Sequence, residues 1–378
     1  MITRHKGAIF FVLTAFLVSA TNLSQAAVNT ADIDQVRDKE LLDSKDFQTI
    51  DDFVAAAVGE LRRTADFTSV AKERMVIVSR KSSNKQSAHI QYAGQFYKSA
   101  YKYISSGLDD ASRLTPEDRQ FKTVLNLLIL VDNLADVQLA DLGIRMLNDK
   151  KPAIRYWAVH SLTNINIIEQ LNAGTAADLE LARRIIAQLK GLVKGAGPEI
   201  ITLMVEFAGE LNIKEAEELL LEIAEMRMGK YADWTVDYTP LDATVLKTLY
   251  KKMSSTGANK PVIAQHFAQL YSYTIQRYIR NINGGGFLND TQKQQLASVL
   301  AETEKACISK LLEMAQAKIR KAIEQDDYTT LLQEHNDLLG DETKPGRLAS
   351  KLNFDYGKTA DGNRRTAPLA LPEQPKTK

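Results

Sequence analysis

The chain has 378 residues, of which 44% are hydrophobic and 25% are charged. This composition is ordinary for a soluble globular protein and supplies enough apolar residues for one large or two ordinary domains. The formal net charge of +1 gives no bulk attraction to nucleic acid, and the single cysteine, Cys307, excludes an intramolecular disulfide. We interpret Cys307 as a small buried hydrophobic residue; a reactive thiol or an intermolecular link is the alternative.

Residues 1–26 have the pattern of a secretory signal peptide. A basic start precedes an apolar run from Ala8 to Ala20, and small residues follow at positions 24 and 26. Cleavage is expected after Ala26, with Ala20 as the second choice. The apolar run is shorter than the roughly 20 residues of a membrane span, so an uncleaved anchor is the weaker alternative. We therefore expect an exported chain, periplasmic or secreted, with no membrane span after signal cleavage.

Residues 27–114 are expected to form an N-terminal helical region. Apolar residues from Phe47 to Leu61 recur at offsets of three and four, which is the spacing of one helix face. The run from Val70 to Val78 contains four consecutive apolar residues that are also compatible with a short strand. Its neighbouring residues favour a helix.

Aromatic residues crowd more than one face of the next predicted helix, between positions 92 and 104. One face is expected to lie in the core. The other face, with Tyr97 and Tyr101, is a candidate partner-binding surface, because exposed tyrosines are common anchors of binding sites. Packing of all these rings in the core is the alternative.

The sequence Thr115-Pro116-Glu117-Asp118 predicts the start of a helix. Thr115 is expected to cap it and Pro116 to occupy its first position, where a missing N–H costs nothing. The following segment, Val124–Val131, is apolar nearly all round and too short to span a bilayer. It predicts a central helix that neighbouring helices cover on most sides.

The stretch Val137–Ile165 predicts two amphipathic helices joined by a tight turn. Apolar residues at offsets of three and four give each helix one apolar face. Asn148 and Asp149 are expected to end the first helix, and Pro152 stands in the first turn of the second. The two apolar faces can be buried against each other, which makes the stretch a helical hairpin.

Six residues of this hairpin form a recognisable pattern: Leu147, Asp149, Ile154, Arg155, Ala158 and Leu162. The pattern resembles the turn and second helix of a HEAT or armadillo-like repeat. The resemblance implies an all-α fold in which helix pairs stack into a right-handed superhelix that serves as a binding scaffold. It also gives Asp149 and Arg155 a turn-holding role. Pro152 and Trp157 are further structural positions of the repeat.

The apolar pattern of Ile154–Ile165 recurs 46 residues later at Ile200–Leu211 and again around Leu246–Met253. A period near 46 lies within the range of about 40–47 residues that is typical of HEAT and armadillo repeats. An additional predicted helix at Ala216–Ala224 breaks a strict two-helix count. We therefore expect residues 115–258 to form irregular HEAT-like repeats.

The segment Gly229–Pro240 is the longest insert without a helical pattern and is rich in aromatic residues. Inserts in repeat proteins collect on one face, which is often the binding face. Tyr231, Trp234 and Tyr238 are therefore candidate partner-binding residues. Aromatic plugs that cover a gap between helices are the alternative.

Residues 259–340 are expected to form C-terminal helices. The pattern predicts a long helix from Pro261 to Asn281, a glycine turn at 284–286, and one long helix over 290–325. A shorter helix, Tyr328–Leu339, is expected to end at Gly340.

Residues 341–378 differ in composition from the rest of the chain. Proline, glycine and charged residues are frequent there and large apolar residues are few, which predicts a disordered tail. Weak docking of its excess basic residues on an acidic surface or on lipid headgroups is the alternative.

No motif in the sequence indicates catalysis, a metal or a cofactor. The five histidines are scattered, and neither an HExxH nor a GxSxG motif occurs. We expect an exported helical-repeat scaffold that binds a protein or peptide partner, without catalytic residues, cofactor or nucleic acid. The alternative is an α-helical enzyme that acts on cell-envelope polymers, with acids that come together only in the fold.

Overall fold

The computed structural model describes residues 28–64, 67–255, 259–284 and 286–374. The predicted signal peptide, residues 1–26, lies outside these ranges. Within them all regular structure is helical, apart from two isolated bridges that join Gly340 to Pro345 and Lys358 to Arg364. The prediction of an all-α fold is confirmed. None of the described helices is both long and apolar enough to cross a bilayer.

The helices vary in length, and one 3₁₀ segment (η1) and one π segment (η2) adjoin them. In chain order they are α1 (Ala31–Arg37), α2 (Ser44–Arg63), α3 (Phe67–Val78), α4 (His89–Ala111), α5 (Glu117–Leu134), η1 (Val137–Leu139), α6 (Ala140–Met146), α7 (Pro152–Leu162), α8 (Ile165–Asn172), α9 (Ala176–Lys190), α10 (Pro198–Glu210), α11 (Lys214–Ala232), α12 (Pro240–Met253), α13 (Lys260–Asn283), α14 (Asp290–Thr303), η2 (Glu304–Ile308), α15 (Ser309–Leu311), α16 (Lys318–Glu324), α17 (Tyr328–Leu339) and α18 (Arg347–Leu352).

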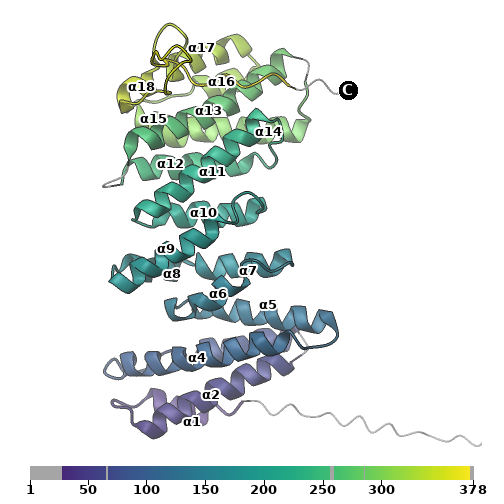
Figure 1. Cartoon of the computed structure of the whole chain (residues 1–378), viewed down its shortest axis with the longest axis vertical. Helices are drawn as coiled ribbons and strands as arrows, with labels where there is room; N and C mark the ends of the chain where they lie inside the picture. Colours follow the sequence, from purple (N-terminus) through teal and green to yellow (C-terminus); the bar gives the residue numbers. More distant parts are fainter. Residues whose placement is uncertain (1–27, 65–66, 256–258, 285, 375–378) are drawn as a thin grey trace, which may run out of the picture.

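Successive helices climb the long axis of the molecule, from α1 and α2 at one end to α17 and α18 at the other (Figure 1). In one layer α5, α7, α10, α12 and α14 pack against one another in that order. In a second layer α2 packs against α4, α4 against α6, α9 against α11, and α11 against α13. Pairs such as α4 with α5, α6 with α7, and α12 with α13 join the two layers and bury the apolar faces between them.

The first layer contains the predicted central helix, α5, whose Leu127, Leu128 and Leu130 are fully buried. Its burial confirms the prediction of a covered central helix. The predicted start is wrong in detail, since α5 begins at Glu117 and Pro116 takes the cap position. Thr115, which precedes a cis peptide bond, therefore does not cap the helix.

The hairpin Val137–Ile165 is built differently at both ends from the prediction. Its first helix consists of the 3₁₀ turn η1 followed by α6, and its second helix, α7, begins with Pro152 as predicted. α7 ends at Leu162, because the side chain of Asn164 accepts a hydrogen bond from the N–H of Asn166 and so caps the next helix, α8. Ile165 therefore starts α8 instead of ending α7.

The turn between α6 and α7 is held by the two residues that the repeat pattern singles out. Asp149 Oδ1 accepts a hydrogen bond from the N–H of Lys151 at 2.8 Å. Arg155 Nη1 donates to the carbonyl oxygens of Asp149 and Lys150, at 2.9 and 3.1 Å. Trp157 lies half-buried, with its ring centroid 5.0 Å from that of His160. These contacts fix the start of α7 on the preceding turn.

The predicted long helix over residues 290–325 is wrong. α14 ends at Thr303, the π segment η2 and the short α15 follow, and the chain turns back before α16 begins at Lys318. The buried carboxylate of Glu304 explains the turn, because it accepts hydrogen bonds from the N–H groups of Ile319 and Arg320 at 2.9 and 3.0 Å. It thereby satisfies free N–H groups at the start of α16.

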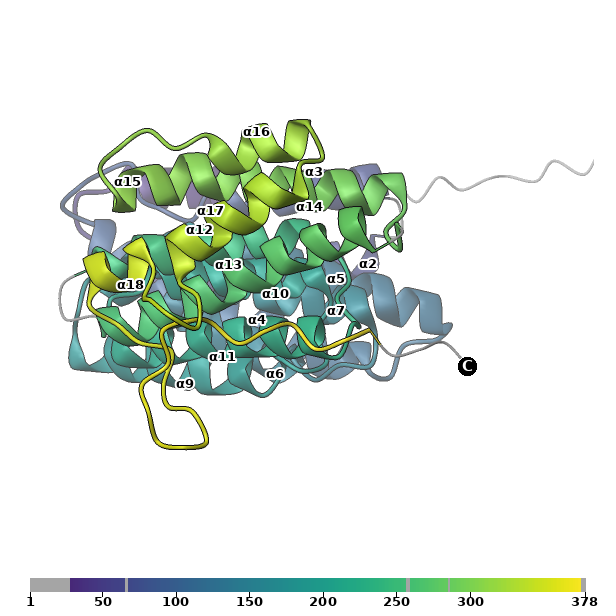
Figure 2. The ribbon, with the colours of Figure 1, turned by 90° about the horizontal axis from the view of Figure 1, so that it is seen from above.

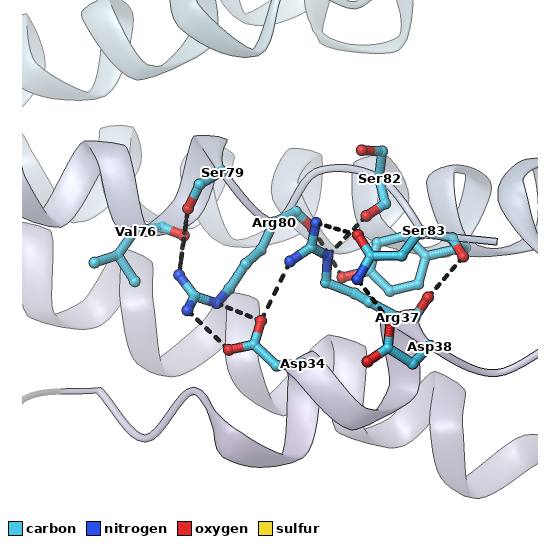
Figure 3. Close-up of polar contacts among 10 residues, drawn as sticks. Asp34, Arg37, Asp38, Val76, Ser79, Arg80, Ser82 and Ser83 are labelled. Carbon is cyan, nitrogen blue, oxygen red and sulfur yellow. Dashed lines mark hydrogen bonds and ion pairs between the residues drawn. The ribbon is translucent and has the colours of Figure 1, made fainter.

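A polar clamp ties α1 to the segment that follows α3 (Figure 3). Arg80 donates to both carboxylate oxygens of Asp34, at 3.0 and 2.9 Å, and Arg37 Nε donates to the carbonyl of Ser82 at 2.8 Å. The hydrogen bond from Arg80 lowers the pKa of Asp34. These hydrogen bonds therefore hold α1 against the segment that follows α3.

The C-terminal segment folds back onto the last helices, so the prediction of a disordered tail is wrong for residues 341–374. α18 packs against α13 and α17. Phe354 and Tyr356 are buried with their rings edge to face at 5.3 Å, and the Tyr356 hydroxyl donates to the carbonyl of Leu339 at 2.8 Å. Leu371 is 1% exposed. A few apolar residues, each buried, therefore anchor a segment whose composition is mostly polar.

Candidate functional site

A row of polar and aromatic side chains runs along one face of α13. Its members are His266, Gln269, Tyr273, Gln276 and Arg280. They alternate between spacings of three and four, which places them on one side of a helix. The row borders a groove of about 430 Å³, which Glu225, Met228, Gly229 and Ala232 line on α11 and which Tyr356 and Leu369 of the C-terminal segment help to enclose.

The chain's own C-terminal segment, residues 367–374, lies along this row (Figure 2). Gln269 Nε2 donates to the carbonyl of Leu369 at 3.1 Å, and Gln269 Oε1 accepts from the N–H of Leu369 at 2.7 Å. Gln276 Nε2 also donates to the carbonyl of Leu369, at 3.1 Å, while its Oε1 accepts from the N–H of Leu371 at 2.7 Å. Alternate residues of an extended chain present their main-chain groups to the same side, and Leu369 and Leu371 do so here.

Two further residues hold the end of this segment. Arg280 donates through both terminal nitrogens, to the carbonyl oxygens of Leu371 and Pro372. Trp234 Nε1 donates to the carbonyl of Pro372 at 3.0 Å. The side chain of Leu371 is buried, whereas that of Leu369 is 44% exposed. The hydrogen bonds of α13 and Trp234 with the segment are therefore made to the main chain of the segment, and one of its apolar side chains, that of Leu371, is buried.

Such an arrangement can recognise an extended polypeptide. Each glutamine amide offers a donor and an acceptor and can pair with one N–H and one C=O of a peptide main chain. Main-chain hydrogen bonds of this kind give affinity, while pockets for alternate side chains give specificity. We name the face formed by Gln269, Gln276, Arg280, Trp234 and the lining residues of α11 the α11–α13 groove.

The rim of the groove is joined across the two helices. His266 Nδ1 lies 2.8 Å from the carbonyl oxygen of Val262, and His266 Nε2 lies 3.1 Å from Oε1 of Glu225 on α11. Glu225 is the single carboxylate among the groove's lining residues. The paired acids that glycosidase-type chemistry needs are therefore not brought together here.

The aromatic patch predicted at residues 231, 234 and 238 does not exist as one surface. α11 continues to Ala232, so the first residues of the predicted insert are helical. Tyr231 is fully buried, Trp234 is half-buried, and Tyr238 is 53% exposed. The prediction of a partner-binding Tyr231 is wrong, because its ring fills the core and its hydroxyl donates to Asp242 at 2.7 Å. Trp234 alone of the three reaches the α11–α13 groove.

A buried ion pair supports the loop that carries Trp234. Arg227 donates to both carboxylate oxygens of Asp242, at 2.7 and 3.1 Å, and both residues are at most 1% exposed. Arg227 also donates to the carbonyl of Asp237 at 2.9 Å and to its carboxylate at 3.2 Å. Burial raises the pKa of Asp242 despite the opposing effect of Arg227. The network fixes the loop between α11 and α12, and with it the position of Trp234.

The second predicted aromatic surface lies on α4, at the other end of the stack (Figure 1). Tyr97 is 8% exposed, so the prediction that it contacts a partner is wrong; burial raises its pKa. Tyr101 is 36% exposed and borders a shallow depression with Phe47, Asp51 and Lys102. The structure brings neither tyrosine near the α11–α13 groove.

No group of three His, Cys, Asp or Glu side chains within the described ranges has a geometry that could hold a metal ion. Cys307 is fully buried, and burial raises the pKa of its thiol to about 12. The interpretation of Cys307 as a buried hydrophobic residue is confirmed, since a thiol of this kind is almost entirely protonated at neutral pH.

The groove residues on α13 were missed because the apolar face of that helix dominates its pattern. That face contains Phe267, Leu270 and Tyr271, all fully buried. The signal that was available is the opposite row, in which Gln269, Gln276 and Arg280 recur at helical spacing. No feature of the tail's composition indicates that it lies there.

Comparison with known proteins adds no further information on this groove. No protein-family model matches the chain, and no curated protein matches its sequence significantly.

Proposed function

We propose that this chain is an exported, non-catalytic helical-repeat scaffold that binds an extended segment of another protein in the α11–α13 groove. The observation that carries this proposal is the double hydrogen bond between the Gln269 amide and the main chain of Leu369. It is the interaction by which a groove holds an extended peptide of varied sequence. The signal-like pattern of residues 1–26 supports export to a periplasm or a secretory pathway.

The succession of helices supports a degenerate HEAT-like superhelix. α7, α10 and α12 begin with Pro152, Pro198 and Pro240, which are 46 and then 42 residues apart. These three helices pack side by side in one layer, each joined to a helix of the other layer. α11 packs against α10, α12 and α13, and the short α8 is an irregular element of the series.

The bound segment defines the chemistry of the partner. Leu369 and Leu371 use their N–H groups, whereas Pro368 and Pro372, which have none, contribute at most a carbonyl. Prolines favour an extended backbone before binding and so reduce the entropy lost on binding. The partner segment is therefore extended and proline-containing, with an apolar residue at the position of Leu371.

The tail is a built-in competitor for such a partner. A segment tethered to its own binding site has an effective concentration on the order of millimolar. A partner therefore has to bind more tightly than the tail or to arrive when the tail is displaced. The scaffold is consequently expected to bind weakly while its tail is docked.

Peptide display tests the proposal. Leu371→Asp places a charge in the buried position and is expected to release the tail while the groove stays intact. Selection on this variant should enrich extended sequences that have one apolar residue flanked by prolines. A chain that carries Gln269→Ala and Gln276→Ala in addition to Leu371→Asp should enrich none of these sequences. The control chain combines Leu371→Asp with Gln294→Ala, an exposed position on α14, and should enrich the same sequences as Leu371→Asp alone. Equal enrichment by the variant without the glutamines would contradict the proposal.

A further inference from the structure

Arg277 on α13 is a buried cation in an aromatic enclosure. Its side chain is 7% exposed. The guanidinium carbon lies 5.8, 5.3 and 5.7 Å from the ring centroids of Tyr231, Trp234 and Phe287. Aromatic faces stabilise a cation, but they accept none of its N–H groups in ordinary hydrogen bonds. The charge of Arg277 is therefore enclosed while its donors remain to be satisfied.

Three buried polar atoms around Arg277 have no hydrogen-bond partner within the described ranges: Arg277 Nε, Arg277 Nη1 and Thr239 Oγ1. Both residues line one small cavity of about 40 Å³ between the α11–α12 loop and α14, together with Asp237, Gln292 and Gln295. A buried donor without a partner is destabilising, and more so when it is charged. Arg277 and Thr239 both line this cavity, so a ligand held there that accepts hydrogen bonds would supply the partners that their donors lack.

The nearby carboxylates do not serve Arg277. Asp242 pairs with Arg227 and with the hydroxyl of Tyr231, while Asp237 accepts from Arg227 and Lys230 at 3.2 and 2.9 Å. Three cations therefore face two carboxylates in this cluster, and no described carboxylate forms an ion pair with Arg277. A buried excess of positive charge is stabilised by an anion much more than by a neutral molecule.

We propose that this cavity, the Arg277 cavity, binds a small monovalent anion, either chloride or the carboxylate group of a small acid. One buried water needs roughly 10–15 Å³ of such volume, so about 40 Å³ has room for an anion of this size. Arg277 and Thr239 supply the donors, and the rings of Tyr231 and Trp234 flank the Arg277 guanidinium. This site is separate from the peptide groove, because none of its lining residues is one of those that bind the tail.

Tryptophan fluorescence reports on this site. The chain has two tryptophans, Trp157 and Trp234. A Trp157→Phe chain therefore retains a single indole, 5.3 Å from Arg277. Titration with chloride or acetate, at constant ionic strength balanced by a bulky sulfonate salt, should change its emission along a saturable curve, and the anion that binds more tightly identifies the ligand.

Matched variants separate the site from general salt effects. In the Trp157→Phe chain, either Arg277→Gln or Thr239→Val should weaken the apparent binding of the anion at least tenfold. Thr239→Val carries the test if the Arg277→Gln chain does not fold. Arg320→Gln on α16 should retain the response, because it removes an exposed positive charge outside the cavity and leaves Arg277 in place. The Trp234→Phe chain, which keeps Trp157, should not respond. A linear response, or one that Arg277→Gln and Thr239→Val leave unchanged, would overturn the proposal.

Crystals of the full chain grown in bromide provide a direct check. An anomalous peak within hydrogen-bonding distance of Arg277 Nε or Nη1 is the expected result. A cavity that shows only water under these conditions would overturn the proposal.

Discussion

Gln269 and Leu369 lie 100 residues apart in the chain and exchange two hydrogen bonds, one in each direction. The amide of Gln269 satisfies the carbonyl and the N–H of the same residue, while the Leu369 side chain remains 44% exposed. The contact therefore depends on an extended main chain and not on leucine at this position. It is the contact that a foreign segment would have to reproduce.

Removal of the two glutamine side chains should release the tail. In the Gln269→Ala, Gln276→Ala chain the N–H groups of Leu369 and Leu371 lose their acceptors. Hydrogen exchange measured by mass spectrometry over residues 366–374 should become at least tenfold faster, while exchange in α13 changes little. The exposed Gln294→Ala variant is the control and should exchange like the parent chain. Unchanged protection of the tail in the double variant would show that other contacts hold it.

The sequence predicts the positions of the helices better than the turns and long-range contacts that connect them. Pro152 and the Asp149 turn were predictable because proline and a side-chain cap act within a few residues. The break at Glu304 was not, since its carboxylate stabilises a helix start 15 residues further along the chain. Likewise the tail has the composition of a disordered segment. It is ordered by hydrogen bonds to Gln269 and Gln276, which lie about 100 residues earlier in the chain. Contacts between distant residues leave no periodic signal.

The buried pair of Arg227 and Asp242 should be essential for stability. Asp242→Asn leaves a buried guanidinium without its counter-charge, which typically costs about 3–5 kcal/mol. The free energy of unfolding measured with urea should fall by that amount. Asp233→Asn, at an exposed position on the same loop, should change it by less than about 0.5 kcal/mol. A loss below about 1 kcal/mol for Asp242→Asn would indicate that the pair is not formed in solution.

His335 should make stability fall in mild acid. Burial lowers its pKa, and its Nε2 lies 2.8 Å from Oγ of Ser272. The same Oγ accepts a hydrogen bond from Gln276 Nε2. Because the unfolded chain binds the proton more readily, the contribution of neutral His335 is complete above about pH 6.5 and is lost as the pH falls toward the folded-state pKa. His335→Gln should reduce the slope of unfolding free energy against pH between 6.5 and 5 by up to about 1.4 kcal/mol per unit. The exposed Gln294→Ala variant is the control and should leave that slope unchanged.

Gly340 and Gly357 offer a matched test of how closely the tail packs. Both have positive φ angles, 107° and 84°, so alanine is strained at either position by roughly 1–3 kcal/mol. A Cβ at Gly340 would lie only 2.1 Å from the carbonyl oxygen of Thr366, whereas one at Gly357 meets no atom within 4 Å. Gly340→Ala should therefore lower Tm more than Gly357→Ala and should also expose the tail to protease. Equal effects would mean that residue 366 does not approach Gly340 in solution.

Binding of the tail in trans tests the central claim most directly. A fluorescent peptide of residues 365–374 is titrated with the wild-type chain and with the Leu371→Asp chain, and its anisotropy is recorded. The released groove should bind the peptide at least tenfold more tightly than the occupied one, and Gln269→Ala with Gln276→Ala in the Leu371→Asp chain should abolish the binding. Equal affinity of the wild-type and Leu371→Asp chains, or no binding by either, would contradict a peptide-binding groove that its own tail occupies.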